Sequence, residues 1–260
     1  MRIRLALPAS LALLCAASAG AAELSADEVR RRLAAAGAQP ADLAGRDLSE
    51  LDLSGLDLRR ARLARANLFG TRLVGADLAE ADLAGANLDA AWLMRANFER
   101  ANLSNASLFA PVVYSTVEAR QDEAPSFAGA NLAGARVIAR LAGVNLRGAT
   151  LANARLGVDL RNQPMGQMRN DFSGADLSGA DLSGADANRA VFAFANLSNA
   201  RLVGTDLSYA DLSGAELAGA DLSGADLTGA DLAGANFRGA KGLESVKGLA
   251  EARNRDRAQF

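Results

Sequence analysis

Large apolar residues recur at every fifth position over much of this chain. Between residues 170 and 239 they are Phe172, Leu177, Leu182, Phe192, Leu197, Leu202, Leu207, Leu212, Leu217, Leu222, Leu227, Leu232 and Phe237, with Ala187 in the one remaining place. A second small apolar residue, nearly always Ala, stands two positions before each of them. Five residues turn an α-helix by about 500°, which leaves successive positions about 140° apart, and five steps along a strand reverse its face. The pattern therefore predicts a backbone that turns once in every pentapeptide.

A four-sided coil satisfies this pattern. About 20 residues would return the chain to a point one strand spacing, roughly 4.8 Å, above its start. The large residue and the Ala two before it would point inward, while the residue between them and the two that follow would point outward. Gly and Ser after the large residue suit a corner in every repeat. The predicted fold class is an all-β solenoid.

The repeat unit resembles a known family. Ala175-Asp176-Leu177-Ser178-Gly179 recurs almost unchanged at Ala180, Ala210 and Ala220, and this sequence resembles the A-(D/N)-L-x-x motif of the pentapeptide-repeat family. The resemblance implies a right-handed quadrilateral β-helix. It does not imply a function, because one fold serves many roles.

The repeats form three blocks that two insertions separate. The first block covers 41–110, and the third is the one described above. The large apolar residues of the middle block are Phe127, Leu132, Val137, Leu141, Leu146, Leu151 and Leu156. We predict one solenoid over 41–239 with insertions at 111–125 and 159–169. The 35 pentapeptides (14, 7 and 14 in the three blocks) predict about nine coils. Val137 and Leu141 are one residue too close, which predicts a distorted corner.

The first 22 residues have the pattern of a secretory signal peptide. Arg2 and Arg4 precede an apolar run at 5–17, and small residues follow at 19–21. The run is short for a membrane anchor, and a lipoprotein site at Cys15 is a further alternative that Leu14 disfavours. We expect a periplasmic or secreted protein. Cys15 is the only cysteine, so the processed chain would have no disulfide.

Both ends of the solenoid are predicted to carry a cap. Residues 23–40 predict a short helix with Ser25 as N-cap, acids in its first turn and Gly37 as its end. Such a helix would cover the edge of the first coil. Residues 240–260 predict a C-terminal cap or tail with a possible short helix around Val246 and Leu249. Pairing of two copies through this end, as a homodimer, is the alternative.

The composition argues against an enzyme. The chain has no His and, after processing, would have no Cys, which removes the common zinc ligand sets and thiol nucleophiles. We expect no cofactor, metal or nucleic-acid partner, and a binding or structural scaffold for an unidentified macromolecule. The family resemblance adds an alternative, because its quinolone-resistance members mimic DNA and bind DNA gyrase, a type II topoisomerase. A signal peptide argues against that role.

Charge is segregated along the chain. Residues 171–237 hold ten acids and two Arg, a net charge of −8, whereas 110–169 hold seven Arg and four acids, a net charge of +3. Asp186, Asp206 and Asp226 are 20 residues apart, so they should form an acidic column with a spacing of roughly 5 Å. The column could bind a basic partner or calcium, or simply keep the rod soluble.

A second candidate site surrounds Trp92, which replaces the usual outward Asp or Asn. Val74 and Met94 should also point outward on this face, and the first insertion adds Val112, Val113 and Tyr114. The insertion could fold over Trp92 and bury it. Alternatively, these six residues could form an exposed apolar patch that binds a partner.

Overall fold

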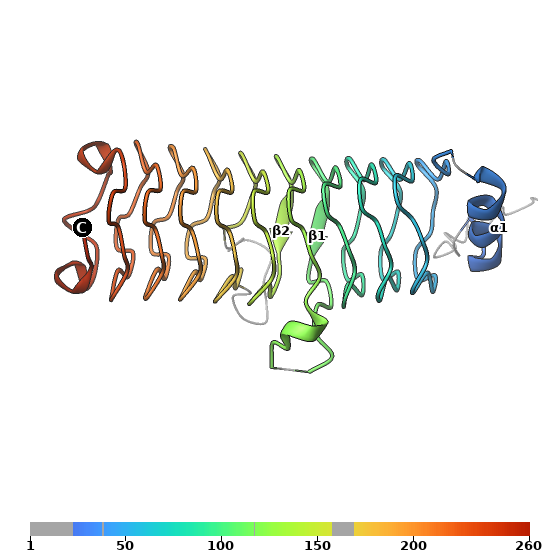
Figure 1. The fold of residues 1–260 in the computed structure, drawn as a ribbon, viewed down its shortest axis with the longest axis horizontal. Coiled ribbons are helices and arrows are strands. Elements are labelled where there is room, and N and C mark those ends of the chain that lie inside the picture. The colour runs from blue at the N-terminus through green and yellow to red at the C-terminus, as the bar shows by residue number, and fades with distance from the viewer. Residues whose placement is uncertain (1–22, 38, 117, 158–168) are drawn as a thin grey trace, which may run out of the picture.

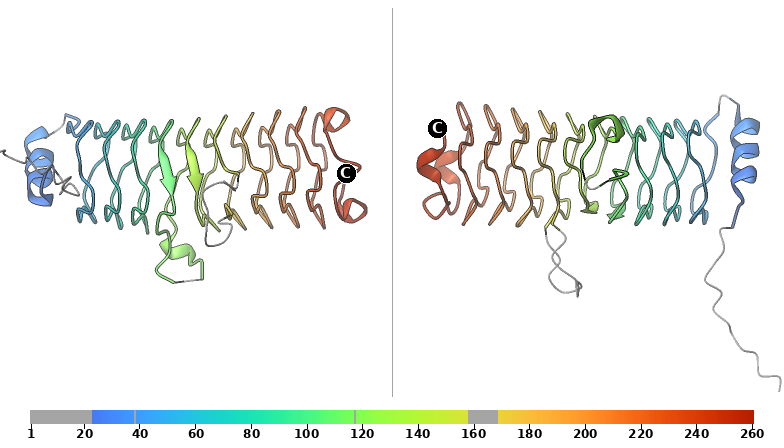
Figure 2. Two further views of the ribbon diagram at one scale, coloured as in Figure 1. Left: turned by 180° about the vertical axis from the view of Figure 1, so that it is seen from behind. Right: turned by 90° about the horizontal axis from the view of Figure 1, so that it is seen from below.

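The chain forms a straight stack of four-sided coils with a helix at its N-terminal end (Figures 1 and 2). The computed structural model describes residues 23–37, 39–116, 118–157 and 169–260. The expected signal peptide at 1–22 and nearly all of the expected second insertion, 159–169, lie outside the described residues. No helix within the described ranges has the length and apolar character needed to cross a membrane.

Parallel bridges join each coil to the next along four columns, which we call the first to fourth faces. They begin at Asp42, Asp47, Asp52 and Asp57, and each successive member is normally 20 residues further on. The second face consists of Asp47, Asn67, Asn87, Ser107, Arg136, Arg155, Asp186, Asp206, Asp226 and Lys247. The third face consists of Asp52, Arg72, Trp92 and Val112, followed by Arg140, Asp171, Val191, Asp211, Asp231 and Arg253. Each member of a face marks one level of the stack.

The outward residue of each pentapeptide makes both hydrogen bonds of the ladder to the coil below. The Arg62 amide donates to the carbonyl of Ala41 (2.9 Å), and the Arg62 carbonyl accepts from Leu43 (2.8 Å). A turn then closes each corner, as where Ala61 N–H donates to Leu58 C=O (3.0 Å). The residue before the end of this turn, Arg60, has φ of 60°. Most repeats have Gly at this position, because Gly adopts a positive φ without steric cost.

The Asp or Asn of the motif has a structural role in the turn. The Oδ1 atom of Asp171 accepts a hydrogen bond from the amide of Ser173, two residues on (2.9 Å), and the same contact recurs at most outward Asp and Asn residues. Such Asx turns satisfy an amide that points away from the ladder. A carboxylate and an amide oxygen perform this role equally, so the turn alone does not require negative charge.

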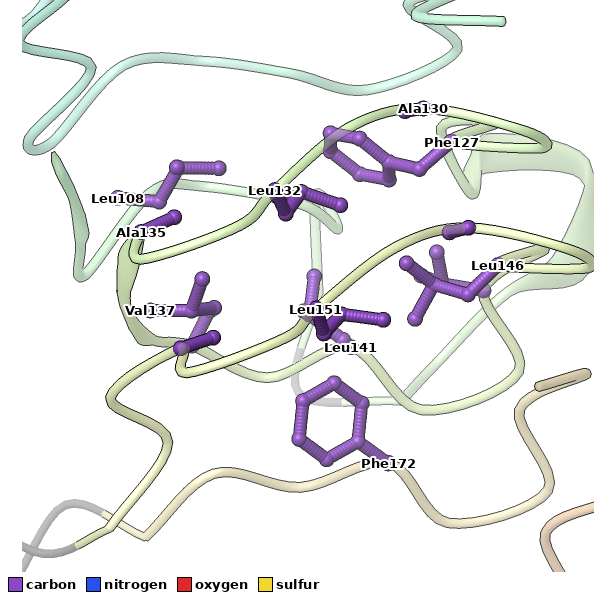
Figure 3. Packing of buried hydrophobic residues seen from close by; sticks show 14 of the residues in the cluster. Leu108, Phe127, Ala130, Leu132, Ala135, Val137, Leu141, Leu146, Leu151 and Phe172 are labelled. Carbon is purple, nitrogen blue, oxygen red and sulfur yellow. The ribbon is translucent and has the colours of Figure 1, made fainter. Parts of the chain in front are cut away.

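The interior is filled by the predicted apolar positions. The large residues from Leu43 to Phe237 and the Ala residues between them form one continuous cluster of almost fully buried side chains. Figure 3 shows Phe127, Leu132 and Leu146 pointing into the same interior space. Where two Phe residues follow each other in a column, as at Phe98 and Phe127, their rings stack at 4.8 Å. Each buried large residue contributes roughly 1.5–3 kcal/mol.

The two insertions and the short repeat appear as changes of spacing within the columns. The step lengthens to 29 residues between Asn97 and Ser126 and shortens to 19 between Ser126 and Asn145. It lengthens again to 31 residues between Asn145 and Asp176. The longest ladder segments occur beside the first insertion, where β1 (Ser107–Phe109) pairs in parallel with β2 (Arg136–Ile138). Inside that insertion lies the 3-10 helix η1 (Gln121–Glu123).

The two ends differ. At the N-terminus, helix α1 (Ala26–Ala36) has Ser25 as its N-cap, and Val29 is fully buried against the core. At the C-terminus the columns continue at Lys241, Lys247, Arg253 and Gln259, which are six residues apart.

The C-terminal segment contains two short 3-10 helices, η2 (Leu243–Ser245) and η3 (Arg255–Arg257). Val246 and Leu249, expected on a short helix, instead lie outside both and pack against the core. The pentapeptide motif ends at Gly239, so the nine coils that it predicts do not include this last one. With it, each face contains ten members among the described residues, as the second face illustrates.

Candidate functional site

The third face carries the aromatic candidate, Trp92, between residues of the adjacent coils. Trp92 bridges to Arg72 below and to Val112 above. The Arg72 guanidinium carbon lies 4.7 Å from the centre of the indole ring, within the range of a cation–π contact. Trp92 is half-buried as a result.

The six residues of the predicted apolar patch divide into two groups. Val74, Trp92 and Val112 are half-buried. Met94, Val113 and Tyr114 are buried, at 8%, 3% and 7% exposure. Val113 and Tyr114 belong to the continuous core. In this conformation, only the first group presents apolar surface to a partner.

Hydrogen bonds hold the first insertion against the coils, in an arrangement we call the Glu123 clasp. The Glu123 carboxylate accepts from both the amide and the hydroxyl of Ser115 (2.7 Å each). The Glu123 carbonyl accepts from the amide of Arg95 (2.7 Å). The bonds from Ser115 lower the pKa of Glu123, the amide first and the hydroxyl second. Glu123 is largely shielded from solvent, and each of its carboxylate oxygens accepts a hydrogen bond, which offsets the cost of burying a charge.

A small cavity of about 180 Å³ lies beside the base of the insertion. It is lined by Ala110, Pro111, Val112, Val113, Tyr114, Ala139 and Arg140. The Tyr114 hydroxyl donates to the carbonyl of Ala142, and burial raises the pKa of Tyr114 to about 12. The cavity is too small for a drug-sized ligand, which needs roughly 300 Å³ or more.

The second face carries the predicted acidic column. Asp186 bridges Asp206, and Asp206 bridges Asp226, so the three do stack. Below them stand two stacked bases, Arg136 and Arg155. Among the described residues, none of these five side chains takes part in an ion pair.

The acidic column omits a contact that the same face uses elsewhere. Lower on this face, the Asn67 amide donates to Asp47 (3.0 Å) and the Asn87 amide donates to Asn67 (3.1 Å). An Asp above another Asp cannot donate in this way and adds repulsion. Asn at position 206 would complete the Asx turn, donate downward and remove a charge. The column therefore carries its negative charge at some cost in stability.

The column does not have the geometry of a metal site. Within the described ranges, no group of three or more Asp, Glu, His or Cys side chains is placed to share a metal ion. One oxygen of each carboxylate already accepts a backbone amide, from Asn188, Ser208 and Thr228 respectively. In the described part of the chain, the other oxygen of each accepts no hydrogen bond and can face a partner.

The repeat pattern does not predict the two exposed aromatic residues that stand at left-handed corners. Phe194 and Tyr209 are 74% and 50% exposed and occupy left-handed corners, with φ of 58° and 56°. Aromatic residues at corners that Gly usually occupies were the signal in the sequence. Arg189 lies over the Tyr209 ring, 4.9 Å from its centre. The repeat pattern also does not predict the amide ladders, by which we mean the side-chain hydrogen bonds that Asn residues donate from one coil to the coil below. These bonds depend on which outward residues meet between coils.

The comparisons with known proteins agree with the repeat pattern. Residues 41–73, 71–108, 171–208 and 205–241 match the family described as Pentapeptide repeats, and these segments span more than half of the chain. No curated protein matches the sequence.

Several solved structures are similar to this chain. HetL, a pentapeptide repeat protein involved in heterocyst differentiation regulation in the cyanobacterium Nostoc sp. strain PCC 7120, is 31% identical, with 91% of this chain and 94% of that chain covered and a TM-score of 0.43. QnrB1, a plasmid-mediated fluoroquinolone resistance protein, is 20% identical over 76% of this chain and 77% of its own, with a TM-score of 0.35. A pentapeptide repeat protein of the Arabidopsis thaliana thylakoid lumen is 28% identical over 47% of this chain and 69% of its own, with a TM-score of 0.26. On the matched segments, the chain belongs to the pentapeptide-repeat family.

Proposed function

We propose that this protein is an exported, non-catalytic scaffold that binds another macromolecule through the charged outer surface of its coils. The stacked Asp residues of the second face carry this proposal. Asn would fulfil the same role in the turn, extend the amide ladder and avoid repulsion. Because the fold does not need this charge, we infer that it serves an interaction outside the chain.

The binding role is tested by neutralising the acidic column. A variant carrying Asp186→Asn, Asp206→Asn and Asp226→Asn keeps the Asx turns and removes three charges. We expect a partner captured by the wild-type protein at low ionic strength to be lost with this variant. The control is Asp176→Asn, Asp211→Asn and Asp221→Asn, which removes three charges from the other faces. Equal capture by both variants would contradict a role for the column.

The export proposal depends on the pattern at residues 1–22 and needs its own experiment. Expression of the full chain in a Gram-negative host, followed by fractionation and N-terminal sequencing, should yield a periplasmic product that begins near residue 22. A cytoplasmic product that retains Met1 would contradict export. That result would leave the binding role of the column open.

The alternative, mimicry of DNA toward gyrase, receives less support from the arrangement of charge. The acidic column covers three levels and is bounded by Arg155 below and Lys247 above. A surface that imitates a DNA duplex needs acidic side chains along more of the rod than these three levels. Gyrase supercoiling assays with the processed protein test this directly, and inhibition that the Asp-to-Asn column variant abolishes would favour the alternative.

A further inference from the structure

The second face is electrostatically self-complementary. Along five successive bridged positions it reads Arg136, Arg155, Asp186, Asp206 and Asp226. We propose that two copies of this chain pair side by side and antiparallel through their second faces. The inference rests on the binding role proposed above and assigns the second face a partner, namely a second copy.

A two-fold axis midway between the levels of Arg155 and Asp186 produces the pairing. It places Arg155 of one copy opposite Asp186 of the other, and Arg136 opposite Asp206. Each pair occurs twice because the interface is isologous. Four ion pairs would form, and every coil keeps the same spacing of roughly 4.8 Å, so the levels stay in register along the interface.

Beyond these levels the match is partial, because the next level sets Asp226 opposite Ser107, which carries no charge. The same axis brings Lys247, at the top of the face, opposite the level of Asn87. Asp89 points outward from that level, two residues along the chain, and is half-buried. Lys247 of one copy would therefore meet Asp89 of the other. In the parallel arrangement, by contrast, Arg would face Arg and Asp would face Asp.

The charged groups are available for such contacts. Within the described residues, Arg136 and Arg155 make no ion pair, and Arg136 lies over the Phe109 ring, 4.6 Å from its centre. Asp186 and Asp206 likewise have no basic partner within 4.0 Å in that part of the chain. Pairing with a second copy would also offset the repulsion within the acidic column.

The size of the interface sets the expected strength. The four ion-paired levels, at roughly 4.8 Å each, give a charged strip about 15–20 Å long. A strip of this length on one narrow face buries less than the roughly 800 Å² per partner of a standard interface. We therefore expect a weak dimer that forms at low ionic strength and dissociates at about 0.5 M salt, where charges are screened within a few ångströms.

Sedimentation equilibrium with charge-swapped variants tests the proposal. The purified wild-type protein should show a concentration-dependent shift from monomer to dimer at about 20 mM salt. One variant carries Arg136→Glu with Arg155→Glu, and the other carries Asp186→Arg with Asp206→Arg. Each variant alone should be monomeric because it places like charges opposite each other. An equimolar mixture should recover the dimer, which also demonstrates that both variants fold.

Matched controls lie on the opposite, fourth face. Arg147→Glu with Arg238→Glu, and Asp176→Arg with Glu216→Arg, make the same changes in net charge. Both controls should retain the wild-type dimer. Loss of the dimer in these controls would indicate a general effect of net charge and would overturn the proposed interface.

Two further outcomes would overturn the inference. A dimer that persists in both second-face variants would place the contact elsewhere, with the C-terminal end as the first candidate. A wild-type protein that stays monomeric up to about 0.5 mM at low salt would show that the second face does not pair with itself. If that monomer still captures another protein through the acidic column, the proposed binding function stands without this partner.

Discussion

The Phe194 ring packs against Gly214, which is 20 residues further along the chain and on the next coil. A Cβ atom built on Gly214 would come within 2.5 Å of Cδ1 and Cε1 of Phe194. Tyr209 and Gly229 repeat the relationship, with 2.8 Å between the corresponding atoms. Glycine at these corners is therefore required twice, by its own φ and by the aromatic residue one coil below.

Gly214→Ala should therefore destabilise the protein more than an equivalent change elsewhere in the same corner column. Gly174 has almost the same φ, 62° against 64°, and a Cβ there would meet nothing within 4 Å. We expect Gly174→Ala to cost about 1–2 kcal/mol for the left-handed conformation alone. Gly214→Ala should cost about 0.5–1 kcal/mol more, because Phe194 must leave its position. Chemical denaturation of both variants measures the difference.

The Phe194→Ala background provides the control for this prediction. Without the ring, Gly214→Ala and Gly174→Ala should cost the same free energy of unfolding. A difference that survives in the Phe194→Ala background would mean that the aromatic residue is not its cause.

Asp206→Asn should stabilise the protein. It removes repulsion from Asp186 and Asp226, worth about 1 kcal/mol per pair at this spacing in water before salt screening, and it allows an amide hydrogen bond to Asp186 of about 0.5–1.5 kcal/mol. Physiological salt reduces the first contribution, so we expect a gain of about 1 kcal/mol by chemical denaturation.

The matched change for this prediction is Asp176→Asn on the fourth face. Asp176 has Asn145 below it and Asn196 above it, so no acid neighbours it in its column. The new amide can donate to Asn145 below it, but the change removes no like-charge repulsion, so the gain in stability should be smaller than for Asp206→Asn by about the repulsion contribution. A loss of stability in Asp206→Asn would show that the column is favourable for the fold.

Leu212→Asp should prevent the coils around it from folding. Leu212 is fully buried, and truncation of such a residue to Ala already costs about 2–5 kcal/mol. An unpaired carboxylate at this position adds a large desolvation cost. Ala193→Asp, at an outward position of the same face, should leave the melting temperature nearly unchanged. Similar melting temperatures for the two variants would contradict the inward register.

Acid should release the first insertion from the coils. The hydrogen bonds from Ser115 lower the pKa of Glu123 below its ordinary value of 4.5. A carboxyl group whose pKa is lower in the folded state than in the unfolded state stabilises the folded state at pH values above the unfolded-state pKa. This stabilisation is lost as the pH falls through the folded-state pKa. Limited proteolysis or amide exchange of the insertion should therefore increase progressively as the pH falls below 4.5.

Glu123→Gln separates this effect from general acid unfolding. An amide can still bond to Ser115, but it is neutral and does not titrate, so the insertion of this variant should be somewhat more accessible to protease at pH 7 and should lose the extra response to acid. Glu118→Gln, an exposed residue of the same insertion, should behave like the wild-type protein. If the insertion of Glu123→Gln opens on acidification to the same extent as in the wild-type protein, Glu123 is not the group that releases it.

The regular part of the fold could be predicted because every repeat imposes the same condition. Leu at the fifth position and Ala two before it define the inward sites, and the columns of bridges follow from the 20-residue period. Asp186, Asp206 and Asp226 could be stacked from arithmetic alone. The absence of His likewise restricts the candidate chemistry, because imidazole is the commonest metal ligand and general base.

The irregular part could not be predicted from the period. Met94 occupies an outward position and is nevertheless buried, in the region where the path of the insertion is set by Glu123, Ser115 and Arg95. Each side of the last coil takes six residues instead of five, as the spacing of Lys241 and Lys247 shows, so this coil does not match the motif. In both places the deciding contacts join segments that have no repeat in common.

Trp92 provides the test of the third face. Its ring is half-buried, with Arg72 stacked on it at 4.7 Å and Val112 on the coil above. Since it is the only tryptophan, its fluorescence reports this position alone. We expect an emission maximum between those of buried and fully exposed indole, and partial quenching by acrylamide.

Arg72→Ala should shift that emission to longer wavelength and increase the quenching, because the guanidinium no longer shields the ring. Acrylamide is the suitable quencher, since iodide would respond to the lost charge as well. Arg62→Ala, at the same level on the first face, removes an equal charge without touching Trp92 and should leave the spectrum unchanged. Strongly blue-shifted emission in the wild-type protein, with little quenching in either variant, would mean that Trp92 is inaccessible and that the third face offers a partner no aromatic contact.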